Sequence, residues 1–317
     1  MRTTSLALVT LLASCAPEYQ QPRDACLATA PGGASASEDA NAAVVQLNCY
    51  RRFAGLGKAR VDTELSSAAA AHASYLDVNW TNGDSLTEEL PGYPLFTGAT
   101  LADRATSHEF YYASDATVAV LEVVETKLEA TMPPGAMISA WMDDPFARQY
   151  MLQPSVMGVG FGQTNTWAVY DVAYSEPTLE ASDHPITYPA AKQIGVATTW
   201  VAPQDVFVVS SEIPPIVQGV SYGYPITLTV GGYDMSTSSA NPYDVQLLEA
   251  PTLTCSVDGD VPVVVFTPEN LATSTLLQTV VIIPAMPLAP SSDCHLTTRL
   301  GWSGTTGDVD ITYTTGE

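Results

Sequence analysis

The chain has 317 residues and a formal net charge of −23, with 34 acidic against 11 basic residues. This length exceeds that of one typical domain, so we expect two, each large enough to bury its own core. The acidity argues against nucleic acid as a partner, because a phosphate backbone attracts a basic surface. We interpret the charge as a solvated surface that keeps the protein soluble; cation binding and a salty medium are the alternatives.

The first fifteen residues have the pattern of an export signal. A charged start precedes an apolar run, Leu6–Ala13, which is too short to span a bilayer as a mature helix. The run ends in Leu-Ala-Ser-Cys, which resembles the bacterial lipobox, after which Cys15 is lipidated. We therefore expect a lipid-anchored protein of the bacterial cell envelope, either periplasmic or surface-exposed. The alternative is an ordinary signal peptide cut near Ala16, which would give a secreted protein.

Four cysteines remain if Cys15 carries the lipid, in a chain exported to an oxidising space. Sequence alone leaves three pairings open. Proximity along the chain favours Cys26–Cys49 and Cys255–Cys294, since each bridge then stays within one half. Free buried thiols are the alternative, and the absence of Cys-x-x-Cys and Cys-x-x-His spacing disfavours a metal site.

Residues 16–39 are rich in Pro, Gly, Ser and Ala, which predicts a flexible tether. A helix is expected from about Ala40 to Phe53, followed by Gly55, where a helix would stop. A second helix is predicted after Asp62 or Thr63, either of which can accept hydrogen bonds from the first turn.

The second helix carries Leu65, Ala69, His72 and Leu76 at steps of four, three and four, which places them on one face. The alanines of this helix allow another element to pack closely against that face. A lone histidine on an apolar face is more often a hydrogen-bonded core residue than a ligand, and we interpret His72 in this way.

A third helix is predicted after the cap Thr100, and residues 117–130 are expected to be helical or mixed. Pro133-Pro134 begins a further helix that Pro145 interrupts. Two strands should follow, the Gly-rich VMGVGFG at residues 156–162 and the alternating Thr166–Tyr174.

A series of different short motifs occurs along this half of the chain. They are Asn48, Arg51, Gly55-Leu56, Leu65, His72-Ala73, Tyr75, Phe96–Gly98, Asp103–Ala105, Leu121–Val124, Ala140–Met142, Pro154 and Gly158–Gly160. As an ordered set they resemble the CAP superfamily of cysteine-rich secretory, antigen 5 and pathogenesis-related proteins, most closely its bacterial, SCP-like branch. The resemblance covers roughly residues 40–176 and implies an α-β-α sandwich.

The resemblance also implies a cavity in which two histidines and two acids can hold a divalent metal. Here Thr87 or Glu88 stands where the first histidine belongs, and Ala147 stands in place of the second. Because alanine can neither ligate a metal nor move a proton, a two-histidine zinc site is not expected. Among the acids, Glu122 matches its position well and Glu89 is a second candidate.

Glu88, Glu89 and Glu122 together could still bind a hard cation such as calcium weakly through oxygen. The alternative is that Glu122 hydrogen-bonds a buried loop. We expect no other cofactor. Arg104 and Arg148 are expected in buried structural contacts such as ion pairs.

The composition changes at residues 177–190, whose Pro, Ser and acidic content predicts a linker. Beyond it, seven strands rich in Val, Ile, Thr and Tyr are expected between turn residues. They are Val206–Ser210, Ile226–Val230, Val245–Leu248, Val261–Phe266, Thr279–Ile283, His295–Leu300 and Val309–Thr312. Their number and spacing predict a β-sandwich over residues 191–317, which resembles bacterial immunoglobulin-like modules.

The predicted protein is thus an α+β, lipid-anchored surface protein with a degenerate CAP domain and an immunoglobulin-like domain. The leading hypothesis is binding of a small apolar ligand, a lipid or a surface protein without catalysis. One alternative is a hydrolase, peptidase or metal-dependent enzyme that uses Glu122 with Glu88 or Glu89 and with His72. A structural or adhesion element is the other. Convergence of these side chains in one open pocket would favour the enzyme, whereas an apolar groove at Ala147 would favour ligand binding.

Overall fold

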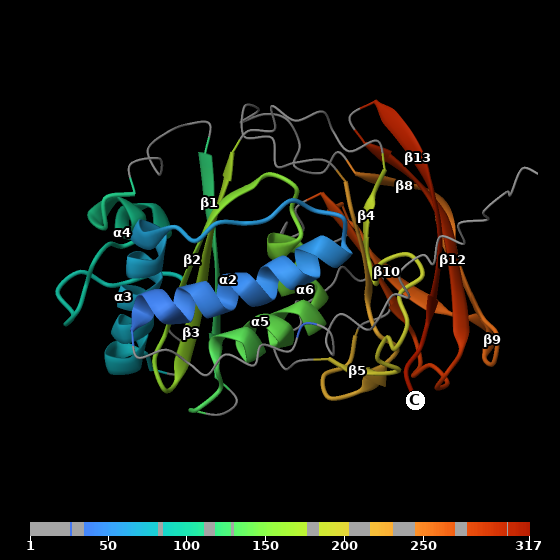
Figure 1. The fold of residues 1–317 in the computed structure, drawn as a ribbon, viewed down its shortest axis with the longest axis horizontal. Helices are drawn as coiled ribbons and strands as arrows, with labels where there is room; N and C mark the ends of the chain where they lie inside the picture. Colours follow the sequence, from blue (N-terminus) through green and yellow to red (C-terminus); the bar gives the residue numbers. More distant parts are fainter. Residues whose placement is uncertain are drawn as a thin grey trace, which may run out of the picture.

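The computed structural model describes residues 26, 35–81, 85–110, 118–127, 130–175, 184–202, 216–230, 245–269, 278–302 and 304–317. They form helices and antiparallel sheets, which confirms the predicted mixture of α and β structure (Figure 1). Cys15 and the predicted strand 206–210 lie outside the described residues. None of the described helices is long and apolar enough to cross a bilayer.

Helix α2 spans Ala36–Phe53 and so begins inside the predicted tether. Ser35 caps it by accepting a hydrogen bond from the Glu38 backbone, and acidic residues in the first turn favour the positive end of the helix dipole. Cys26, also within the predicted tether, is buried and forms the predicted disulfide with Cys49. The disulfide therefore attaches the middle of the predicted tether to the last part of α2.

Helices α3 (Thr63–Asn79) and α4 (Leu101–Ser107) have the predicted caps. The Asp62 carboxylate accepts from the Leu65 backbone N–H at 2.9 Å. Thr100 and Asp103 exchange hydrogen bonds as a reciprocal capping box.

Strand β1 (Val118–Thr126) occupies the segment expected to be helical or mixed. Its β-branched residues favour a strand, and it pairs with β3 along its whole length. Pro145 ends α5 (Pro134–Asp143) and begins α6 (Pro145–Met151), since proline is tolerated in the first turn of a helix.

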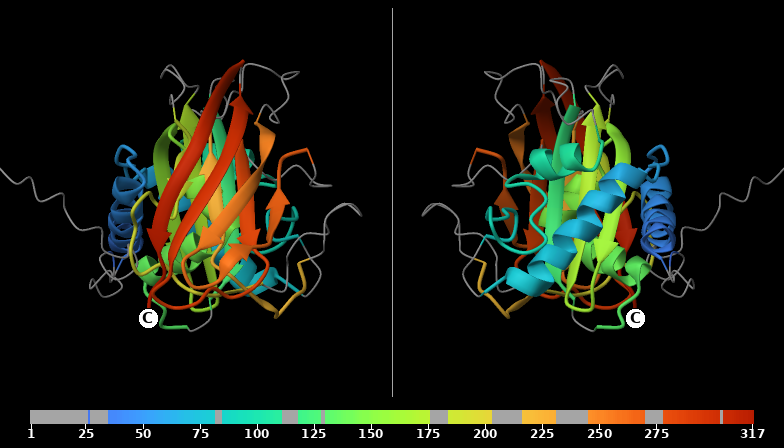
Figure 2. Two further views of the ribbon diagram at one scale, coloured as in Figure 1. Left: turned by 90° about the vertical axis from the view of Figure 1, so that its right-hand side faces the viewer. Right: turned by 90° about the vertical axis from the view of Figure 1, so that its left-hand side faces the viewer.

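Strands β2 (Val156–Gln163) and β3 (Trp167–Ser175) complete an antiparallel sheet of order β1-β3-β2. Successive side chains of β3 point to opposite faces. Tyr170 and Val172 pack in the main core with residues of α2 and α5, whereas Trp167 and Val169 pack against α3. Figure 2 shows α3 lying across one face of this sheet in its right-hand view.

The second half of the chain contains two four-stranded antiparallel sheets and a two-stranded one. The first has the order β10-β11-β7-β4, with β4 at Ile186–Tyr188, β7 at Ile226–Thr229, β10 at Val263–Phe266 and β11 at Thr279–Pro284. The second has the order β13-β12-β8-β9, with β8 at Gln246–Cys255, β9 at Gly259–Val261, β12 at Asp293–Trp302 and β13 at Thr305–Thr314. The small sheet pairs β5 (Trp200–Val201) with β6 (Ser221–Tyr222).

Strand β4 lies within the segment expected to be a linker. Ile186 and Tyr188 are buried, and β4 pairs with β7. The sequence favoured a linker because proline and acidic residues flank these two positions along the chain.

The two larger sheets differ in how many of their faces are buried. All six residues of β11 are buried, so its sheet is covered on both faces. In β12 buried and more exposed residues alternate, so one face packs inward and the other faces solvent. The left-hand view of Figure 2 shows β12 and β13 at this outer surface.

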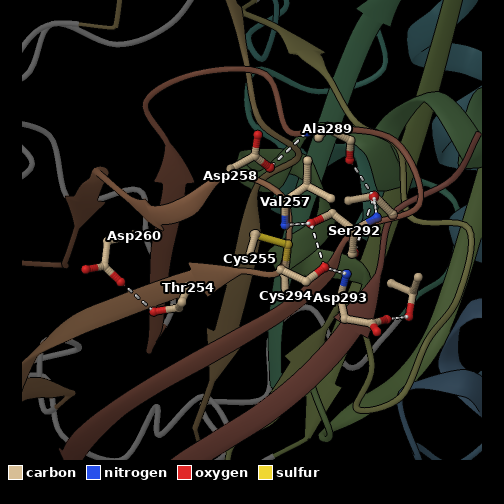
Figure 3. Close-up of a disulfide and its surroundings, with 12 residues drawn as sticks. Thr254, Cys255, Val257, Asp258, Asp260, Ala289, Ser292, Asp293 and Cys294 are labelled. Carbon is tan, nitrogen blue, oxygen red and sulfur yellow. Dashed lines mark hydrogen bonds between the residues drawn. A yellow bond between two sulfur atoms is a disulfide. The ribbon is translucent and has the colours of Figure 1, made fainter.

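The predicted disulfide between Cys255 and Cys294 joins partner positions on β8 and β12 (Figure 3). Close by, the Ser292 hydroxyl accepts from the Val257 backbone at 3.1 Å. The Asp258 carboxylate accepts from the backbone N–H of Ala289 at 3.0 Å. The covalent bond and the two hydrogen bonds hold together the loops at this end of the sheet.

The two halves share one hydrophobic core. Arg148 of α6 donates to the carbonyls of Tyr188 and Pro225 at 3.3 and 3.0 Å, and its guanidinium lies 4.6 and 5.0 Å from the ring centroids of Tyr188 and Tyr224. This buried arginine thus links α6 to the second half through carbonyls and aromatic rings.

Candidate functional site

Two of the motif residues in α2 hold the loop that follows the helix. The Asn48 side-chain amide hydrogen-bonds both backbone groups of Ala59, at 3.0 and 2.7 Å. Arg51 is buried and donates to the carbonyls of Gly57, Met151 and Gln153, each at 2.8 Å. Asn48 and Arg51 therefore hold the loop after α2 and the end of α6 in place, and the buried Arg51 is not available for chemistry.

Four charged or polar side chains meet between α3, α4, β1 and the loop before α4. His72 Nδ1 lies 3.0 Å from Glu89 Oε1. Arg104 Nη2 donates to both oxygens of Glu122, at 2.7 and 2.8 Å. His72 Nε2 lies 3.8 Å from Glu122 Oε1, so the two pairs form one cluster. The ion pair expected for Arg104 is present.

The partners of His72 leave neither ring nitrogen free. Nε2 lies 2.9 Å from the Leu86 carbonyl, which can only accept a hydrogen bond, and Nδ1 faces the Glu89 carboxylate. Both nitrogens are therefore held by groups of the loop between α3 and α4.

Glu89 receives most of its hydrogen bonds from the Phe96–Gly98 motif. Its Oε2 accepts from the backbone N–H groups of Thr97 and Gly98, at 2.6 and 3.3 Å. Burial alone would raise the pKa of Glu89, but hydrogen bonds from His72 and Thr97 and the charges of His72 and Arg104 lower it. Glu89 is therefore an ionised carboxylate held by the loop.

Asp171 is a member of the cluster that sequence reasoning missed. It faces Glu122 across the β1–β3 pair and is fully buried. Neither of its carboxyl oxygens accepts a hydrogen bond from another described residue. Burial, and then the charge of Glu122, raise the pKa of Asp171 well above its ordinary value, although Arg104 opposes the shift.

Opposite charges offset one another within this cluster. Arg104 pairs with Glu122, and His72 lies against Glu89. The raised pKa of Asp171 favours its neutral form. This compensation allows the cluster to be buried, because an uncompensated charge in the interior is costly.

The structure brings together three of the four predicted catalytic candidates, His72, Glu89 and Glu122. Their side chains are 0, 0 and 3% exposed. Glu88 is exposed and lines a separate cavity with Tyr93.

Two positions where the resemblance implies histidines have structural roles. The Thr87 carbonyl accepts a hydrogen bond from Arg104 Nη1 at 3.1 Å, and Ala147 is 6% exposed in the main core. The side chains of His72, Glu89 and Glu122 therefore converge, but in a buried cluster and not in an open pocket.

This cluster does not fit a divalent metal. Both nitrogens of His72 already face acceptors, and Arg104 occupies the carboxylate of Glu122. A metal ligand needs a free lone pair, and a nearby guanidinium repels a second cation. Among the described residues, no group of three or more His, Cys, Asp or Glu could hold a metal ion.

Comparison with known families agrees with the motifs in this half of the chain. Residues 45–175 match the model of the cysteine-rich secretory protein family, CAP. This match confirms the resemblance for the segment, which we call the CAP segment. No curated protein matches the sequence.

One solved structure similar to the chain is an extracellular protein containing an SCP domain from Bacillus anthracis str. Ames. The two share 16% sequence identity with a TM-score of 0.34. The match covers 44% of this chain and 41% of that chain, so it spans less than half of either protein.

Asp171→Asn is expected to change how the stability of the protein depends on pH. Folded Asp171 keeps a proton that the unfolded chain releases above its ordinary pKa. Stability should therefore fall as the pH rises toward the raised pKa, by up to about 1.4 kcal/mol per pH unit. Asparagine cannot ionise, so the variant should lose less stability and exceed the wild type at pH 8.

Urea denaturation between pH 5 and 8 measures this difference, because the window begins just above the ordinary pKa of an aspartate. Burial raises the pKa of Asp144 to about 6 despite its backbone hydrogen bond from Phe146, but Asp144 titrates in both proteins and cancels in the comparison. Asp308→Asn, at a side chain that is 82% exposed, is the matched control and should follow the wild type. Parallel pH slopes for wild type and Asp171→Asn would show that Asp171 is not protonated in the folded protein.

Proposed function

We propose that this is an exported protein whose CAP segment binds a ligand or partner without catalysis. The observation that carries the proposal is that the polar cluster is closed: His72, Glu89, Arg104 and Glu122 contact one another and are buried. A general base or nucleophile must reach the substrate, and these groups face only protein.

The enzyme alternative depends on Glu122 acting with Glu89 or Glu88. Both carboxylate oxygens of Glu122 accept from Arg104 Nη2, and Glu89 accepts hydrogen bonds from a loop backbone. Glu88 lies outside the cluster. Activation of Glu122 would require breaking a buried ion pair, which costs several kcal/mol, about 3–5. The cavity beside α3 supports ligand binding over a purely structural role.

Export is proposed from two features. The apolar N-terminal run ends at Cys15, and the chain has two disulfides of the kind that persist in oxidising compartments. We propose that lipid on Cys15 anchors the protein to the cell envelope. The second half, with its paired antiparallel sheets, is proposed to be an immunoglobulin-like module that presents the CAP segment.

Metal analysis of the purified protein, alongside Glu122→Gln, tests the non-catalytic proposal against a metal-dependent enzyme. We expect no stoichiometric zinc in the wild type, in the variant or in the control Glu249→Gln, which changes an exposed carboxylate. Stoichiometric zinc that Glu122→Gln loses and Glu249→Gln keeps would contradict the proposal. The intact mass of protein extracted from membranes tests the anchor, because a mass without a lipid on Cys15 would refute it.

A further inference from the structure

A cavity of about 380 Å³ opens beside the C-terminal end of α3. Tyr75, Trp80 and Tyr93 contribute aromatic rings to its lining, and Glu88 contributes a carboxylate. The volume lies within the range of small-molecule sites, and the mixture of aromatic groups and one charge is typical of them.

Hydrogen bonds hold this cavity in shape. The backbone N–H of Leu90 donates to the Tyr75 hydroxyl at 2.8 Å, and Asn79 Nδ2 donates to the Pro94 carbonyl at 2.8 Å. Both connect α3 to the loop on the other side of the cavity. Trp80 packs edge-on against Trp167, with ring centroids 5.1 Å apart. These contacts hold the described walls of the cavity in place, which lowers the entropic cost of binding.

The electrostatics of the cavity favour a positive ligand. Helix α3 ends here, and its C-terminus carries the negative end of the helix dipole. Its last turn contains no basic residue that would neutralise this end. Glu88 adds a full negative charge, and the net charge of −23 raises the local concentration of cations.

The lining favours an organic cation over a metal ion. Calcium needs six to eight oxygen ligands, and Glu88 supplies the only carboxylate among the residues described at this cavity. Aromatic rings, in contrast, attract ammonium groups through their negative faces, and rings around one carboxylate suit a methylated ammonium group.

We propose that the cavity binds a small organic cation with a methylated ammonium group, held by Trp80, Tyr93 and Glu88. This inference rests on the proposed binding function and names its ligand class.

Isothermal titration of the purified protein with choline tests the inference. The uncharged isostere 3,3-dimethyl-1-butanol has the same shape without the charge. Choline should bind saturably and at least about fivefold more tightly than the alcohol. Tyr93→Ala and Glu88→Gln should each weaken choline binding about two- to fivefold, because each removes one attraction at a partly exposed site.

Glu249→Gln is the matched control, since it removes an exposed carboxylate on β8, and it should leave choline affinity unchanged. Both replaced side chains are exposed, so the variants should keep the wild-type circular dichroism spectrum. Equal binding of choline and the alcohol would overturn the cation inference but leave apolar ligand binding intact. No binding of choline, or affinity within 1.5-fold of wild type (roughly 0.2 kcal/mol) in both variants, would also overturn it. Failure of the proposed non-catalytic function would be detected by a different experiment, the metal analysis.

Discussion

Arg104→Met is expected to lower the free energy of unfolding by about 3–5 kcal/mol, as breaking a buried ion pair from one side does. Methionine fills a similar volume but cannot donate hydrogen bonds. Glu122 would lose both bonds from the guanidinium while its side chain stays 3% exposed. Glu89 would also lose the nearby positive charge that helps keep it ionised. The cluster would then contain one unmatched negative charge.

Urea denaturation at pH 7 measures this loss, and two further variants establish its cause. Arg299→Met removes a partly exposed arginine paired with Asp308, and should cost less than about 1 kcal/mol. The double variant Arg104→Met, Glu122→Gln restores neutrality and should recover part of the lost stability. An Arg104→Met protein as stable as Arg299→Met, or no recovery in the double variant, would contradict the charge-balance argument.

Sequence predicted those elements whose signals are local. Caps such as Asp62 and Thr100 accept hydrogen bonds from residues three positions along, so the sequence identifies them directly. The start of α6 at Pro145 is local for the same reason. Proximity also favoured the disulfide pairs that the structure contains.

Elements that depend on distant partners were harder to predict. Residues 118–126 form a strand because β3 pairs with them, and that partner lies some fifty positions along the chain. Strand β4 similarly depends on β7. A short segment with mixed preferences takes the structure that its neighbours stabilise.

Only part of the polar cluster could be found from the sequence. The motif positions identified Glu122, and Glu89 was a weaker candidate. Asp171 lies in a strand whose alternation could equally place it toward solvent, and only its register with Glu122 shows that it is buried beside another acid. Glu88 was a candidate that the structure places outside the cluster. It is adjacent to the buried Glu89 in the sequence, but its side chain lines the outer cavity. The strand register therefore places Asp171 in the cluster, and the path of the loop places Glu88 outside it.

Gly162→Ala should destabilise the protein by about 3 kcal/mol or more, at the upper end of the cost of overpacking. A Cβ atom at Gly162 would overlap the backbone of Ala70 and Ala69 in α3. Because the overlapped atoms are backbone, no side-chain rotation can relieve the clash. Helix α3 would have to move away from the sheet, which would separate Ala69 from its packing with Trp167.

Gly57→Ala provides the matched control, since a Cβ atom there meets no atom within 4 Å and the backbone is not in the left-handed region. That change should alter stability by less than about 1 kcal/mol. Near-ultraviolet circular dichroism follows the packing of Trp167, and urea denaturation gives the free energies. Adding Ala70→Gly to Gly162→Ala should not restore stability, because the clash is with the Ala70 backbone. Rescue by Ala70→Gly would show that the clash involves the Ala70 side chain and would contradict the backbone argument. Equal stability of the two alanine variants would mean that α3 can shift without cost, and the close approach of α3 to β2 would then not be what holds His72 beside Glu122.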